Sequence, residues 1–211
     1  AASGSEAIIA NNLISVEDYG IYIDDYNYYQ NVYYNSVKVR DGYALYTGYG
    51  SLYNTLINNI FESTNAAAAY FYNASVTTSS DHNDFYTAYA YQIYYSGNKT
   101  LAQWQSYGQD SNSVSIDPVY DTDSTLVPLS LVLDNLGTPV TGITDDINGT
   151  NRSETTPDMG AIEFSVSGSP LSGSYTVGTG GDFESIANAI NSLVIYGISG
   201  PVTFNILPGT Y

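Results

Sequence analysis

A fourfold repeat constrains this chain more than any other feature of its sequence. The repeats are marked by four asparagines that lie 23, 24 and 24 residues apart, namely Asn12, Asn35, Asn59 and Asn83. A constant period in the twenties is typical of solenoids, in which each repeat forms one turn of a coil. The region from Ile8 to Tyr95 is therefore predicted to be a stack of similar turns.

Apolar and polar residues alternate within each repeat. In the first repeat, Asn12, Ile14 and Val16 share one face of the chain. Two further inward columns keep the same period: Ile9, Val32, Leu56 and Ser80, and Ile21, Leu45, Ala69 and Ile93. Alternation with a period of two is the pattern of β-strands. We therefore predict an all-β fold, a parallel β-helix with about 24 residues per coil.

The asparagine column is predicted to lie at a turn of the coil. Equivalent residues of successive coils would stack ~4.8 Å apart, which is the spacing of neighbouring strands. At this spacing the side-chain amides can bond to one another and to the backbone of adjacent coils. We interpret Asn12, Asn35, Asn59 and Asn83 as a structural asparagine ladder.

A column of tyrosines is the candidate binding site. The chain has 23 tyrosines, and 18 of them lie between Tyr19 and Tyr95. The register of the repeat places one column on the outer surface: Tyr22, Tyr46, Tyr70 and Tyr94. Tyrosine favours strands and has a phenol edge that tolerates water. The column either shields and stiffens the coil or contacts sugar rings or the tyrosines of another filament.

Charge and composition disfavour several partners. Lys and Arg total 4 and Asp and Glu total 21, which gives a net charge of −17. Such a chain repels nucleic acid and anionic membrane surfaces. No apolar run approaches the ~18 residues of a membrane helix. We expect no nucleic-acid partner and no direct membrane insertion, and the absence of cysteine excludes disulfides and Cys-ligated metals.

Residues 97–164 are predicted to close the coil. Thr100 and Gln103 have the spacing of a capping box, so a short helix should begin here and lay Leu101 and Trp104 on the open end of the coil. Strand-like sequence follows at Leu131–Leu133 and Pro157–Phe164. Residues 165–174 are rich in Ser and Gly and are interpreted as a linker.

Residues 175–211 are predicted to begin a second unit. A strand starts at Tyr175, and Asp182 is expected to cap a helix. The apolar face of that helix is formed by Phe183, Ile186, Ala187, Ile190 and Leu193. Gly200-Pro201 is expected to break the helix before a second strand from Val202 to Ile206.

Several segments together resemble a known family. Gly180–Ile186, Gly200–Ile206 and Pro208–Tyr211 resemble the opening of right-handed β-helix modules of the pectin-lyase-like kind, in large tandem-repeat surface proteins of Bacteroidota exported by the type IX route. The usual end of such a module is similar to Thr100–Trp104, Ser115–Tyr120, Thr144–Gly149 and Pro157–Phe164. The resemblance implies that residues 1–96 are the last coils of one module, 97–164 its closing segment, and 175–211 the capping helix and first strand of the next.

No catalytic constellation is evident in the sequence. Lys38 should face outward, and the only histidine, His82, is expected in a surface turn. The sequence Asp145-Asp146-Ile-Asn148-Gly resembles part of a Ca²⁺ loop but lacks its full spacing and distal Glu. A turn and a weak Ca²⁺ site both remain open there, and no other cofactor is expected.

We therefore expect a non-enzymatic, extracellular structural or adhesive module of a tandem-repeat cell-surface filament, such as an adhesin or a gliding-type filament. Its expected partners are adjacent modules of the same polypeptide, further copies of itself, or surface glycans. The alternative is a carbohydrate-binding or polysaccharide-cleaving β-helix protein. Turnover of a polysaccharide would separate these two hypotheses.

Overall fold

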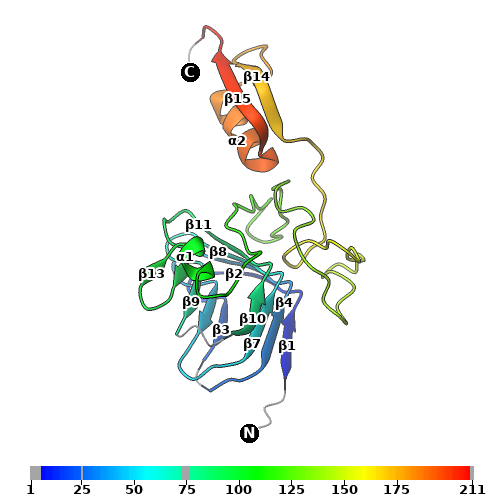
Figure 1. Cartoon of the computed structure of the whole chain (residues 1–211). Coiled ribbons are helices and arrows are strands. Elements are labelled where there is room, and N and C mark those ends of the chain that lie inside the picture. Colours follow the sequence, from blue (N-terminus) through cyan, green and yellow to red (C-terminus); the bar gives the residue numbers. More distant parts are fainter. Residues whose placement is uncertain (1–5, 25, 73–76, 210–211) are drawn as a thin grey trace.

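The repeats form a parallel solenoid of four coils, each of which contributes one strand to each of three sheets (Figure 1). The computed structural model describes residues 6–24, 26–72 and 77–209, so Thr210 and Tyr211 of the predicted opening motif lie outside the described residues. The first sheet contains β1 (Ala7–Ala10), β4 (Gln30–Tyr33), β7 (Asn54–Ile57) and β10 (Thr77–Asp81). The second contains β2 (Leu13–Val16), β5 (Ser36–Val39), β8 (Ile60–Ser63) and β11 (Asp84–Thr87). The third contains β3 (Ile21–Ile23), β6 (Leu45–Thr47), β9 (Ala69–Phe71), β12 (Ile93–Tyr94) and the antiparallel β13 (Asn98–Lys99).

Strand pairing follows the register of the repeat. Val32 pairs with Ile9 and with Leu56, and Leu45 pairs with Ile21 and with Ala69. These columns fill the interior, where Val32, Leu45, Leu56, Phe61 and Phe85 are all fully buried. The predicted all-β parallel β-helix with coils of about 24 residues is therefore confirmed.

Val16 is the exception among the residues predicted to face inward. It pairs with the buried Val39 but is itself 43% exposed. Val16 belongs to the first described coil, where β2 is an edge strand and has a neighbour only on the side of β5. Burial at this end of the coil therefore depends on position in the stack as well as on the face of the strand.

A short helix covers the other end of the coil, as predicted. Helix α1 (Leu101–Gln105) begins after Thr100, whose side chain accepts from Gln103 N while the Gln103 side chain accepts from Thr100 N. Trp104 is fully buried and stacks on Phe71 with ring centroids 4.6 Å apart and planes at 4°. The capping box thus positions an aromatic plug against the last coils.

The rest of the closing segment (residues 97–164) runs back along the side of the coil, as the green to yellow loops of Figure 1 show. It bonds to Asn83 of the last coil through Val114, to Asn58 through Thr138, and to Asn11 of the first coil through Asp145. It also forms a second apolar cluster on the outer face of β8, in which Ile60, Leu133 and Met159 are buried. The segment therefore braces every coil rather than only the open end.

The strand-like sequences of the closing segment do not form strands. Leu131–Leu133 lies in a turn, and Pro157–Phe164 is irregular. Their apolar residues pack on the outer face of β8, while backbone groups bond to side chains, as when Asn135 N and Phe164 N donate to the Asp158 carboxylate. Residues 157–162 are therefore buried continuously by packing on a sheet, without strand pairing.

The C-terminal unit is a parallel strand pair joined by a helix: β14 (Leu171–Val177), α2 (Ile186–Tyr196) and β15 (Ile198–Ile206). Three predictions are wrong in detail. The first strand begins at Leu171 rather than at Tyr175, within the segment interpreted as a linker. The N-cap of α2 is Ser185, because the Asp182 carboxylate instead accepts from the backbone and hydroxyl of Thr176. The helix ends at Gly197, with φ of 67°, and β15 then runs through Gly200-Pro201. Among the described residues, no helix is long and apolar enough to cross a membrane.

Candidate functional site

The four ladder asparagines form one continuous chain of amide contacts. The Asn12 amide nitrogen lies 2.8 Å from Asn35 Oδ1, Asn35 Nδ2 lies 2.9 Å from Asn59 Oδ1, and Asn59 Nδ2 lies 2.9 Å from Asn83 Oδ1. Each acceptor oxygen also receives the backbone N–H of the preceding ladder residue. Asn35, Asn59 and Asn83 are fully buried, so the ladder faces the interior and offers no surface for a ligand.

Asp110 is the last rung of this ladder, and sequence reasoning missed it. Its Oδ1 accepts from Asn83 Nδ2 at 3.1 Å and from the hydroxyls of Ser80 and Ser113, while its Oδ2 accepts from Trp104 Nε1 at 2.7 Å. Burial raises the pKa of this carboxyl, and the four hydrogen bonds oppose the rise. Asp110 follows no repeat, so the period alone gave no signal for it.

A left-handed corner precedes each ladder asparagine. Asn11, Tyr34, Asn58 and His82 have φ between 52° and 60°. The first three face the closing segment: Asn11 Nδ2 donates to Asp145 O, Tyr34 Oη to Thr138 O, and Asn58 Nδ2 to Thr138 O. The position one residue before each ladder asparagine repeats with the same period, but its polar residues differ in type, so the sequence alone does not mark it as a column.

Tyr22, Tyr46, Tyr70 and Tyr94, hereafter the tyrosine row, lie side by side on the outer face of the third sheet. Successive ring centroids are 4.4, 4.6 and 5.0 Å apart, and the ring planes differ by 3°, 13° and 8°. Tyr22 is 49% exposed, and the other three are half-buried. Each ring of the row therefore stacks on its neighbour while one edge remains in contact with solvent.

This stacking limits what the row can bind. Both faces of the Tyr46 and Tyr70 rings are occupied by neighbouring rings, so neither face is free to stack on a sugar. What the row presents to solvent is a line of phenol edges at about the strand spacing. Such edges can exchange hydrogen bonds and pack against another flat surface.

A groove of about 300 Å³ lies between the outer face of the second sheet and the closing segment. Its charged and phenolic lining is Lys38, Glu62, Tyr86, Asp117 and Tyr120. Lys38 faces outward as predicted, and its Nζ lies 3.2 Å from Glu62 Oε1 and 2.9 Å from Asp123 Oδ1. The sequence did not reveal this cluster, because the residues come from three coils and the closing segment.

Burial dominates the electrostatics of this groove. It raises the pKa of the Glu62 carboxyl, although the neighbouring Lys38 lowers it. It also raises the pKa of the fully buried Asp84 carboxyl well above its ordinary value. Burial and the neighbouring Asp117 raise the pKa of Tyr86 to about 12. Buried carboxyls with a raised pKa are the kind of group used in general acid–base chemistry.

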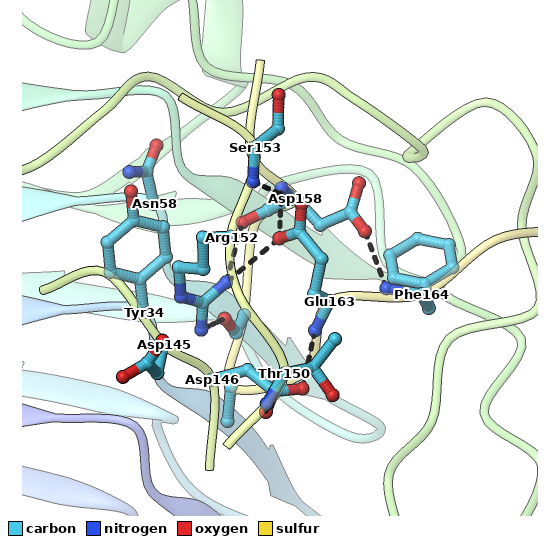
Figure 2. Close-up of polar contacts among 12 residues, drawn as sticks. Tyr34, Asn58, Asp145, Asp146, Thr150, Arg152, Ser153, Asp158, Glu163 and Phe164 are labelled. Atoms are coloured by element: carbon cyan, nitrogen blue, oxygen red, sulfur yellow. Dashed lines mark hydrogen bonds and ion pairs between the residues drawn. The ribbon is translucent and has the colours of Figure 1, made fainter. Parts of the chain in front are cut away.

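Arg152 joins the closing segment to the first coils (Figure 2). Its guanidinium lies over the Tyr34 ring at 3.9 Å, donates to Asn11 Oδ1 at 2.9 Å and to Gly160 O at 3.0 Å, and contacts Glu163 at 3.4 Å. Only 2% of the side chain is exposed. Arg152 borders a pocket of about 400 Å³ formed with residues 139–145, but its own donors point mainly to protein groups. We interpret it as a structural clamp.

The candidate Ca²⁺ residues form a turn. The Asp146 carboxylate is buried and accepts from the backbone of Asn148, Thr150 and Glu163, whereas the side chains of Asp145 and Asn148 are exposed. Within residues 6–24, 26–72 and 77–209, no group of three or more His, Asp or Glu side chains is placed to hold a metal ion. The Asp146 oxygens therefore have backbone partners in this structure.

The family model described as "Right handed beta helix region" matches residues 1–105, which contain the four coils and α1. No curated protein and no solved structure gave a match to the chain. The match supports the right-handed parallel β-helix that the resemblance implied. It extends to the fold alone, since β-helix proteins include both enzymes and non-enzymes.

Proposed function

We propose that the chain is a non-enzymatic structural and adhesive module of an extracellular, tandem-repeat surface filament, as in the Bacteroidota proteins it resembles. The observation that carries this proposal is the tyrosine row, a line of exposed phenol edges on a stiff coil. The row meets its partner edge-on, which favours a flat surface such as another copy of the module over an isolated sugar ring. Adjacent modules of the same polypeptide would extend the coil into a filament.

Stiffness is supported by the way the coils are held together. The buried asparagine ladder, the stacked rings and the closing segment each connect successive coils. These contacts need neither disulfides nor metal ions. A rod of this kind suits a protein that displays a binding surface away from a cell.

The test is to compare Tyr46→Ser with Tyr89→Ser, which removes an exposed tyrosine outside the row. Self-association is measured by light scattering and attachment by retention on coated beads. We expect Tyr46→Ser to weaken one or both, and Tyr89→Ser to leave both unchanged. Equal behaviour of the two variants and the wild-type protein would contradict an adhesive role for the tyrosine row.

A second candidate function is polysaccharide binding or cleavage in the groove of Lys38, Glu62, Tyr86 and Asp117. The specific observation in its favour is the set of buried carboxyls with raised pKa beside a lysine and a phenol. The protein would be incubated with neutral and acidic polysaccharides and assayed for unsaturated products and new reducing ends. Turnover that disappears in Glu62→Gln would replace the structural proposal with an enzymatic one.

A further inference from the structure

The tyrosine row belongs to a larger connected set of phenols. Tyr43 lies 5.4 Å from Tyr70 and 6.4 Å from Tyr46, and Tyr19 lies 5.4 Å from Tyr22 and 6.0 Å from Tyr46, all between ring centroids. Six phenols on four successive coils are thus connected through ring contacts. By contrast, the exposed Tyr89 has no ring contact among the described residues.

We propose that the tyrosine row is a site of oxidative modification, at which a one-electron oxidant forms a dityrosine bond between neighbouring coils. The proposal does not depend on the function proposed above. Its basis is the near-parallel stacking of identical phenols at 4.4–5.0 Å on adjacent strands, together with edges that an oxidant can reach.

The chemistry requires two oxidations in the same row. Each phenol loses one electron to the oxidant and one proton to water, which leaves a phenoxyl radical. Because neighbouring rings are chemically identical and in contact, a radical can move along the row by electron and proton exchange until two radicals are adjacent. Their ortho carbons then form one carbon–carbon bond, and each ring regains its aromatic state by passing the ortho hydrogen to its own oxygen. The net loss is two electrons and two protons.

The register of the strands favours coupling inside the row. Tyr46 pairs directly with Tyr22 and with Tyr70, so their backbones are already held at the strand spacing. Coupling requires only that two rings tilt out of their parallel stack, and the solvent-exposed edges leave room for this tilt. In a chain without cysteine, the bond would supply a covalent connection between coils.

The probe is photogenerated ruthenium(III) tris(bipyridine) with persulfate, at low conversion and low protein concentration. Cleavage after Asp and Glu followed by mass spectrometry locates the bonds, because acidic residues such as Asp24, Glu62 and Asp81 separate the row tyrosines. We expect dityrosine that joins Tyr22 to Tyr46, Tyr46 to Tyr70, or Tyr70 to Tyr94. Cross-links distributed among tyrosines according to exposure, or found only between molecules, would overturn the proposal.

Matched double variants provide the control. Tyr46→Phe with Tyr70→Phe keeps the stacked rings but removes every neighbouring phenol pair of the row, so dityrosine yield should fall several-fold. Tyr89→Phe with Tyr91→Phe removes two exposed tyrosines that have no ring contact among the described residues, and it should leave the yield unchanged. Circular dichroism verifies that both variants fold. A yield that falls equally in both would also overturn the proposal.

Discussion

Asn59 lies in the middle of the asparagine ladder, where all of its polar groups have partners. Its Nδ2 donates to Val32 O, Ile57 O and Asn83 Oδ1, and its Oδ1 accepts from the backbone and side chain of Asn35. A residue of similar size without these groups would leave several buried donors and acceptors unpaired. The ladder therefore requires an asparagine at this position of each coil.

Asn59→Leu is expected to destabilise the protein by at least ~1–3 kcal/mol, which is the cost of leaving one buried polar group unpaired. Chemical denaturation followed by circular dichroism measures the change. Asn148→Leu is the control, because that asparagine is exposed and its side chain makes no hydrogen bond within the described structure. An Asn59→Leu melting temperature equal to that of the wild-type protein would mean that the ladder contributes little.

Gly160 shows a second residue-scale constraint, on the side of the closing segment that faces the coil. Its φ is 85°, and a Cβ at this position would lie 2.6 Å from Ser36 Oγ and 2.9 Å from Ile60 Cδ1. Gly160 N also donates to Asn58 O at 2.7 Å. Only glycine allows the backbone to approach the second sheet this closely.

At the scale of elements, the closing segment is held by carboxylates that accept backbone N–H groups. Asp84 accepts from Ile116, Asp121 from Val127, Asp146 from Thr150, and Asp158 from Asn135 and Phe164. An irregular segment has no strand partner for these donors, so side chains supply the acceptors. Part of the acidic composition of the chain therefore has a structural role.

Arg152→Met is expected to loosen the closing segment from the first coils, because it removes the bonds to Asn11 and Gly160 and leaves Glu163 without its cation. Breaking a buried ion pair costs about 3–5 kcal/mol. Hydrogen exchange should rise in β1 and in residues 142–153, and the free energy of unfolding should fall.

Arg40→Met is the matched control for this prediction. Arg40 is largely exposed and pairs with Glu17 and Asp41 at the surface. Exposed pairs contribute little to stability because water screens the two charges. If the Arg152 and Arg40 variants lose the same stability, the interpretation of Arg152 as a clamp is wrong.

For the whole molecule, the balance of buried carboxyls predicts how stability depends on pH. Burial raises the pKa of Asp158 to about 7 and also raises the pKa of Glu62, Asp84 and Asp110. Between roughly pH 4 and 7 the folded state then holds protons that the unfolded state has released, so the free energy of unfolding falls as pH rises through this window.

The melting temperature should therefore be higher near pH 5 than near pH 8, in thermal scans at constant ionic strength. At still lower pH the sign reverses, because hydrogen bonds lower the pKa of exposed carboxyls such as Asp121 and Asp182, and their contribution is lost on protonation. Asp158→Asn should reduce the slope between about pH 5 and 7. A melting temperature that rises from pH 5 to 8 would contradict this account.

The C-terminal unit has apolar side chains that remain exposed. On α2, Ile186, Ile190 and Val194 are 43%, 52% and 40% exposed, while Ala189 is buried. Of the predicted apolar face, Ile186, Ala187 and Ile190 are exposed and Phe183 and Leu193 are partly buried, and the helix contacts β14. The sequence periodicity could predict an amphipathic helix but not which of its apolar residues would be covered.

The coil could be predicted from the periodicity alone. A period of 23–24 residues with alternation inside each repeat fixes which residues stack, because parallel strands in register place equivalent side chains one above another. The capping box at Thr100 was equally local, since it depends on residues only three positions apart. The asparagine ladder and the tyrosine row followed from the same periodicity.

The contacts of the closing segment, by contrast, became visible only in the folded chain. Asp110 bonds to Asn83, 27 residues away in the sequence (110 − 83), and so ends the ladder. Arg152 bonds to Asn11 across 141 residues (152 − 11), and Lys38 pairs with Asp123 across 85 (123 − 38). No period connects these residues, because the segment is irregular and its contacts depend on the path that it takes along the coil. The edge-on exposure of the tyrosine row is likewise a tertiary property, since the sequence placed the rings outward but ring stacking decided which of their surfaces remain free.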